Sequence, residues 1–168
     1  EKLGLQSDEI IVGLQADEPM LPGKLIDQVA EALASQQLAP IATLSMAIES
    51  MEDLSNPNVV KVVTDQNDYA LYFSRAMIPF DRKAMQTRTA VEDITIFHRH
   101  IGLYAYRAGF LKTFASWSDV VIEDIEQLEQ LRILWHGEKI LVKQAIEHPG
   151  YGVDTPEDLD RVLAIMPR

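Results

Sequence analysis

Short apolar runs alternate with amphipathic stretches along this chain, a pattern typical of a mixed α/β fold. The first run, from position 10 to 13, leads into Gln15, Asp17 and Glu18, and it predicts a buried strand that ends in two adjacent carboxylates. Ligands of open α/β sheets bind beyond the carboxyl ends of strands, so these acids are candidates for function. A plain turn explains the local pattern equally well.

The same criteria predict the remaining elements. Strands are expected over 42–48, 59–64, 69–74, 97–106 and 140–146, and helices over 23–37, 108–117, 122–135 and 156–166. The strands 59–64 and 69–74 form a predicted hairpin with Arg75 at its end, where the guanidinium could pair with a local carboxylate. Residues 79–95 lack periodicity and are predicted as an irregular surface segment.

Two helical residues and one pair of histidines have structural explanations. Glu129 and Gln130 would lie on a solvated helix face, with Glu129 supporting Arg132 one turn later. His98 and His100 project to the same side of the predicted strand 97–106, as zinc ligands can. No third ligand follows at a recognisable spacing, so structural histidines are favoured.

Asp154 is a second carboxylate at the junction of two elements. Thr155 can cap the last helix and Pro156 suits its first position, so Asp154 is not needed as a cap. Asp17 and Asp154 could therefore form a metal pair if the fold brings them to one sheet edge. Mg²⁺ would suit such a pair because it binds hard carboxylate oxygens and leaves positions for phosphates.

Composition and charge narrow the function classes. The chain has 168 residues, a formal net charge of -11 and no cysteine. One globular domain over residues 1–168 is expected, without disulfides or a cysteine nucleophile. The acidity disfavours nucleic acid as a partner, and no apolar run is long enough for a membrane span. Without a membrane span or a recognisable signal peptide, a cytosolic enzyme or binding protein is predicted. No glycine-rich basic loop that could wrap a triphosphate is present.

Several ordered motifs resemble one family. They are Gln15-Ala16-Asp17-Glu18-Pro19, the stretch Asn56-Pro57-Asn58-Val59-Val60-Lys61-Val62-Val63, Tyr69-Ala70-Leu71-Tyr72-Phe73-Ser74-Arg75, Arg99-His100-Ile101-Gly102-Leu103-Tyr104-Ala105-Tyr106-Arg107, Leu128-Glu129-Gln130-Leu131-Arg132, and Gly152-Val153-Asp154-Thr155-Pro156-Glu157-Asp158-Leu159. Together they resemble the CMP-Kdo synthetases, the 3-deoxy-manno-octulosonate cytidylyltransferases of lipopolysaccharide synthesis. The resemblance runs in order across nearly the whole chain.

The resemblance implies a fold, a reaction and a set of site residues. The fold would be a nucleotidyltransferase fold of the nucleotide-diphospho-sugar transferase type, with a mixed sheet and flanking helices. The protein would be a cytoplasmic homodimer that makes CMP-Kdo and pyrophosphate from CTP and Kdo. By resemblance, Asp17 and Asp154 would be catalytic and hold Mg²⁺, while the sugar-acid site would comprise Gln15, Arg75, His100, Tyr104, Glu129 and Gln130.

Two departures from the family pattern keep alternatives open. The resemblance starts about a third of the way into the family and implies a C-terminal portion without the basic phosphate-binding loop, inactive on its own. Gly13 and Ala16 stand where the family usually has Asn and Gly, which affects the backbone next to Asp17. The alternatives are a non-catalytic dimerisation or sugar-acid-binding module, or a cytidylyltransferase for 8-amino-Kdo or a sialic-acid-like sugar.

Overall fold

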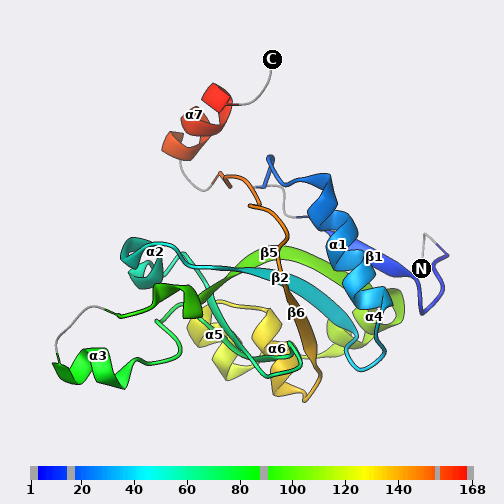
Figure 1. The fold of residues 1–168 in the computed structure, drawn as a ribbon. Helices are drawn as coiled ribbons and strands as arrows, with labels where there is room; N and C mark the ends of the chain where they lie inside the picture. The colour runs from blue at the N-terminus through cyan, green and yellow to red at the C-terminus, as the bar shows by residue number, and fades with distance from the viewer. Residues whose placement is uncertain (1–3, 15–17, 88–90, 154–155, 166–168) are drawn as a thin grey trace.

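The computed structural model describes residues 4–14, 18–87, 91–153 and 156–165. Its strands are β1 (Ile10–Gly13), β2 (Ile41–Ala47), β3 (Lys61–Thr64), β4 (Ala70–Ser74), β5 (His98–Arg107) and β6 (Ile140–Gln144). Its helices are α1 (Gly23–Ala34), α2 (Met51–Ser55), α3 (Arg82–Thr87), η1 (Ile94–Ile96), α4 (Ala108–Ser116), α5 (Val121–Glu126), α6 (Gln130–Trp135) and α7 (Pro156–Ile165) (Figure 1). The predicted α/β class with a mixed sheet and flanking helices is confirmed.

Strand β5 organises the six-stranded sheet, whose order is β4-β3-β5-β2-β6 with β1 also on β5. One edge of β5 pairs with β2 along nearly its whole length. The opposite edge pairs with β3 at residues 98 and 99 and with β1 at residues 104 to 107. The main-chain N–H of His100 still donates to the carbonyl of Val60, just before β3. Strands β1 and β3 therefore share one edge of β5 and leave a gap between them, at residues 101 to 103.

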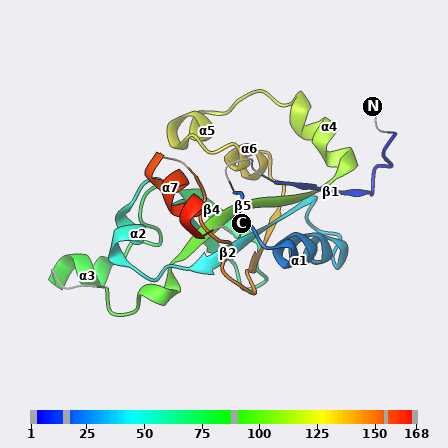
Figure 2. The same ribbon diagram turned by 90° about the horizontal axis from the view of Figure 1, so that it is seen from above.

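Helices cover both faces of the sheet, with α1 on one side and α4, α5 and α6 on the other (Figure 2). Leu25, Val29 and Leu33 of α1 pack on one face, against a cluster that includes Ile101 and Leu103 of β5. The other face of β5 contributes Tyr104 to a second core beneath α4 to α6. Strand alternation over 97–106 predicts one apolar face and one face of hydrogen-bonding rings, and this arrangement confirms that division.

Two sequence-based expectations about these elements are wrong. The alternation of apolar and polar residues over 42–48 predicts a half-buried strand. Strand β2 is instead buried on both faces, because β5 and β6 flank it and helices cover the sheet, so Thr43 and Ser45 are buried as well. The helix expected over 122–135 is two helices, α5 and α6, separated at Gln127, which adopts a left-handed backbone with φ of 53°. Gly137 is the glycine that the sequence offers as a C-terminal stop for this helical stretch, and its φ of 81° confirms that interpretation.

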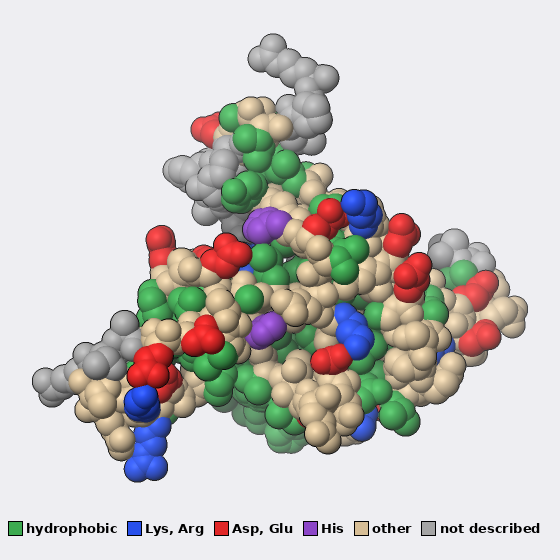
Figure 3. All heavy atoms as spheres, in the orientation of Figure 1, with side chains coloured by type: hydrophobic (Ala, Val, Ile, Leu, Met, Phe, Trp, Pro, Cys, Tyr) green, Lys and Arg blue, Asp and Glu red, His purple; other side chains and the backbone are tan. Residues whose placement is uncertain are grey.

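The segment expected to be irregular holds α3 and η1. This segment packs against a small separate core, which consists of Ile48, Leu54 and Phe97. Acidic side chains are scattered over the face of the molecule that Figure 3 shows, with fewer basic ones between them. Within the described residues, no helix is both long enough and apolar enough to cross a membrane.

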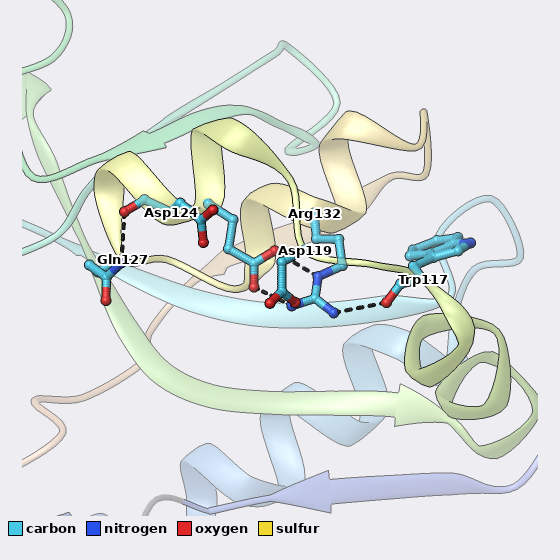
Figure 4. A network of polar contacts seen from close by, with 6 residues as sticks. Trp117, Asp119, Asp124, Gln127 and Arg132 are labelled. Carbon is cyan, nitrogen blue, oxygen red and sulfur yellow. Dashed lines mark hydrogen bonds and ion pairs between the residues drawn. The ribbon is translucent and has the colours of Figure 1, made fainter.

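Arg132 ties together the helices on one face of the sheet. Its guanidinium donates to both carboxylate oxygens of Glu123, with 2.6 Å from Nε to Oε2, and to the carbonyl of Trp117 at 3.2 Å (Figure 4). It also lies 2.5 Å from Asp119. The expected partner Glu129 contributes only its main-chain carbonyl to Arg132, so the predicted side-chain pair is wrong. Because α5 and α6 are separate helices, Glu123 on α5 can lie against Arg132 on α6.

We expect Glu123→Gln to lower the free energy of unfolding by about 2–3 kcal/mol, because it removes charged hydrogen bonds that are largely buried. Bonds from Arg132 hold the pKa of Glu123 below its usual value of 4.5, so this stabilisation is present above that pH and is lost as pH falls through the lower folded pKa. Urea unfolding at a series of pH values measures both effects.

Glu92→Gln is the matched control, because Glu92 pairs with Lys83 on the surface. We expect this control to change stability by less than about 0.5 kcal/mol. Equal losses in the two variants would contradict the role assigned to Glu123.

Candidate functional site

A pocket of about 480 Å³ lies at the gap between β1 and β3. It is lined by Glu18, Asn58, Val59, Val60, Arg75, Arg99, His100, Gly102, Tyr104, Gln127, Leu128, Glu129 and Gln130. Five of the eight predicted site residues, Arg75, His100, Tyr104, Glu129 and Gln130, therefore line a single pocket. The other three, Gln15, Asp17 and Asp154, lie outside the described residues, as does Ala16. His98, in contrast to His100, lines a different pocket.

His100 is a neutral ring on the floor of the pocket. Burial, assisted by the charge of Arg99, lowers its pKa to about 3, because the protein interior disfavours the imidazolium. Its Nε2 lies 3.0 Å from Oγ1 of Thr43, and its ring meets the edge of Phe73 with centroids 5.2 Å apart. The ring is held from two sides and can exchange hydrogen bonds with a ligand without changing charge.

Tyr104 presents an unsatisfied hydroxyl. The residue is only 4% exposed, and its Oη is buried without a hydrogen-bond partner among the described residues. Burial and the nearby charge of Glu129 raise the pKa of this phenol well above its usual value, so it stays protonated. A buried hydroxyl without a partner costs stability, and a ligand that hydrogen-bonds to it recovers that cost.

Arg75 binds main-chain carbonyls rather than the carboxylate partner that its position suggested. Its Nε donates to the carbonyl of Glu126 at 2.7 Å, Nη1 to that of Pro57 at 3.0 Å, and Nη2 to that of Gln127 at 3.2 Å. The carboxylate of Glu126 instead accepts from the main-chain N–H of Arg75 at 2.9 Å. A guanidinium has five N–H groups, so two are left by these bonds for an anionic ligand.

The Arg75 contacts explain why the helix breaks at Gln127. A left-handed residue other than glycine is costly, and here the carbonyls on both sides of the turn point to one cation. The turn starts a new helix at Gln130, which brings Glu129 and Gln130 to the pocket. Their predicted position on a continuous solvated helix is wrong for Gln130, which is buried.

Lys61 is a structural residue of this site that the sequence reasoning missed. Its side chain is fully buried, and Nζ donates to the carbonyls of Asn56 at 2.9 Å and Val59 at 2.6 Å. Burial and the charge of Arg75 lower the pKa of this ammonium. A lysine within the apolar run Val-Val-Lys-Val-Val was the available signal, because a charge inside a strand between valines needs a partner.

The chain segments that carry Asp17 and Asp154 approach each other at their described flanks. Gly150 lies so close to Met20 that a Cβ at Gly150 would stand 2.7 Å from the Cβ of Met20, and its φ is 91°. Among the described residues no group of three potential metal ligands occurs. Two carboxylates have the oxygen chemistry that Mg²⁺ requires, so the predicted pair stays a prediction that this close approach supports.

Comparison with known proteins shows the family. The family described as Cytidylyltransferase matches residues 1–140, and the chain belongs to it. The chain is 55% identical over 167 residues to the 3-deoxy-manno-octulosonate cytidylyltransferase of Aliivibrio fischeri, covering 99% of this chain and 66% of that protein. It is 53% identical over 162 residues to the enzyme of that name from Idiomarina loihiensis, covering 96% and 64%.

Solved structures agree with this relationship. A structure titled as CMP:2-keto-3-deoxy-manno-octonic acid synthetase complexed with CTP matches with a TM-score of 0.83 and 34% identity, over 96% of this chain and 62% of that one. A 4-diphosphocytidyl-2C-methyl-D-erythritol synthase from Anaerococcus prevotii, at 15% identity and a TM-score of 0.52, shares the fold. The resemblance to CMP-Kdo synthetases is confirmed, and the chain spans about two thirds of these relatives.

We expect Lys61→Met to lower the free energy of unfolding by about 2–4 kcal/mol, because two carbonyls beside the pocket lose their donor. Lys83→Met is the control, since Lys83 forms only an exposed pair with Glu92 and should change stability by less than about 0.5 kcal/mol. Chemical denaturation monitored by tryptophan fluorescence measures both. A Lys61→Met variant as stable as the control would show that the buried ammonium does not hold the pocket wall.

Proposed function

We propose that the protein transfers CMP from CTP to Kdo, giving CMP-Kdo and pyrophosphate for lipopolysaccharide synthesis. The observation that carries this proposal is the single pocket in which Arg75, His100, Tyr104, Glu129 and Gln130 meet. Identity at more than half of the aligned positions with relatives named for this activity supports the proposal. The chain spans about two thirds of those relatives, so the activity of the whole relatives is carried to it only as a proposal.

The pocket suits an acidic sugar. Two N–H groups of Arg75 do not donate to carbonyls, and they can bind the Kdo carboxylate. The planar guanidinium has the right shape for a carboxylate. His100 and Tyr104 are neutral and can bind sugar hydroxyls, and Glu129 and Gln130 offer further acceptors and donors. Held in this way, the anomeric hydroxyl of Kdo is oriented to form a bond to the α-phosphorus of CTP while pyrophosphate leaves.

Mg²⁺ is proposed as the cofactor, held by Asp17 and Asp154. When bound, it would offset negative charge on the phosphates of CTP. This assignment fits a protein with a net charge of -11, which otherwise offers few cations for a triphosphate. Cytoplasmic location and a homodimeric state are proposed with it, on the resemblance to the family.

Tyr104→Phe tests the pocket. We expect the variant to bind Kdo about five- to tenfold more weakly, because one hydrogen bond to the sugar is lost. The protein itself loses no bond, since the hydroxyl has no partner among the described residues, so thermal stability should not fall. Tyr106→Phe is the control, because Tyr106 stacks on Tyr104 without lining the pocket. Calorimetric titration with Kdo measures the affinities, and equal effects of the two variants would contradict the site.

Turnover on the full-length protein tests the reaction. We expect pyrophosphate release from CTP with Kdo, and much less with 8-amino-Kdo or a sialic acid in competition. Removal of Mg²⁺ by a chelator, or the substitution Asp154→Asn, should lower turnover on the order of 100-fold or more, while Asp27→Asn on the exposed face of α1 should not.

The outcomes separate the proposed enzyme from its alternatives. Kdo binding without any turnover would favour a non-catalytic sugar-acid-binding module. Turnover that persists in the Asp154→Asn variant would contradict the metal assignment. A preference for one of the competing sugars over Kdo would change the substrate and leave the reaction type in place.

A further inference from the structure

Thr43 has three hydrogen-bonding neighbours in a fully buried position. Its Oγ1 lies 2.9 Å from the carbonyl oxygen of Leu103, 3.1 Å from that of Ile101 and 3.0 Å from Nε2 of His100. The carbonyls come together because the register between β2 and β5 shifts after Thr43, which pairs with Tyr104 while Leu44 pairs with Ile101. This irregularity, and not strand alternation, delivers two acceptors to one hydroxyl.

The proton count of this cluster selects one arrangement. A threonine hydroxyl has one proton, and both carbonyl oxygens can only accept. If the hydroxyl donates to a carbonyl, its lone pair is left to accept a proton from Nε2, and the cluster contains two hydrogen bonds. If the hydroxyl donates to Nε2 instead, the cluster contains only one hydrogen bond. Both carbonyl oxygens then face the lone pairs of the threonine oxygen. The arrangement with two bonds is favoured.

A neutral imidazole carries one proton, so a proton on Nε2 leaves Nδ1 bare. His100 is neutral at ordinary pH for the reasons given above. Its Nδ1 makes no hydrogen bond to any described residue, and His100 lines the pocket. Nδ1 is therefore the ring nitrogen that remains for a molecule bound there.

We propose that Thr43 is a specificity-determining residue, which fixes His100 as the Nε2–H tautomer so that Nδ1 meets the ligand strictly as a hydrogen-bond acceptor. A ligand group at this position must then be a donor, such as a hydroxyl or amine. A carboxylate, a keto oxygen or an ether oxygen is rejected because two acceptors would face each other.

The proposal gives the pocket two groups of opposite hydrogen-bonding character. Arg75 offers only donors and takes an anionic group, while His100 offers an acceptor and takes a hydroxyl. A sugar acid entering the reverse way would place its carboxylate against Nδ1. The chemistry thus orients the sugar acid in one direction, and this part of the inference rests on the proposed function.

Nitrogen NMR on imidazole-labelled protein tests the tautomer without any ligand. Among the four histidines, His100 is assigned by the signal that disappears in His100→Gln. We expect a protonated Nε2 and an unprotonated Nδ1 in the wild type and in Thr43→Ser, which keeps the hydroxyl. In Thr43→Val, which keeps the shape, we expect a large fraction of the Nδ1–H form. A wild type in the Nδ1–H form, or a Thr43→Val protein with an unchanged tautomer, would overturn the proposal.

Binding of Kdo and of its single-deoxy derivatives to the full-length protein tests the specificity. We expect the wild type to lose about tenfold in affinity for the derivative that lacks the hydroxyl at His100. Thr43→Val should reduce this loss to about twofold and leave the losses for the other derivatives unchanged, whereas Thr43→Ser should behave as wild type.

The two experiments fail in distinguishable ways. If Kdo binds no variant and also not the wild type, the proposed function fails while the NMR result still decides the tautomer. If Kdo binds and Thr43→Val discriminates among the derivatives as the wild type does, Thr43 does not determine specificity.

Discussion

The candidate site depends on a cation that satisfies main-chain carbonyls from two walls of the pocket. The guanidinium of Arg75, at the end of the β3–β4 hairpin, binds the carbonyl of Pro57 on one wall and those of Glu126 and Gln127 on the other. The buried ammonium of Lys61 donates to the carbonyls of Asn56 and Val59, on either side of Pro57 in the chain. Long cationic side chains can donate to several carbonyls at once. The bonds of Arg75 therefore join residue 57 to residues 126 and 127.

The second constraint is the length of β5. A ten-residue strand pairs with two shorter strands on one edge, and the space between β1 and β3 is where the pocket forms. Two of the polar groups that line it, the ring of His100 and the phenol of Tyr104, are largely desolvated. His100 loses its charge there and Tyr104 keeps its proton, so both act as neutral hydrogen-bonding groups across the physiological pH range. A site of this kind is preorganised for a polar ligand.

Charge is distributed unevenly between the whole protein and the pocket. The chain carries a net charge of -11, and yet Arg75, Arg99 and the buried Lys61 lie at or beside one pocket. Arg75 and Lys61 donate part of their N–H groups to main-chain carbonyls, and Glu18 and Glu129 line the same pocket as the two arginines, so the pocket offers little excess positive charge for a triphosphate. This is consistent with a sugar-acid site to which a metal ion adds the charge that the phosphates require.

The sequence by itself determined the α/β class, most strands and the two faces of β5, because period-2 and helical patterns are local. The family motifs also predicted five of the residues that line the pocket. Only the tertiary structure decided that the stretch 122–135 is two helices, because the left-handed turn at Gln127 is stabilised by Arg75, about fifty positions earlier in the chain. It likewise decided that Thr43 is buried and contacts His100, since that contact arises from a register shift between β2 and β5. Hydrogen bonds between distant segments leave no periodic trace in the sequence, so they emerge only when the chain is folded.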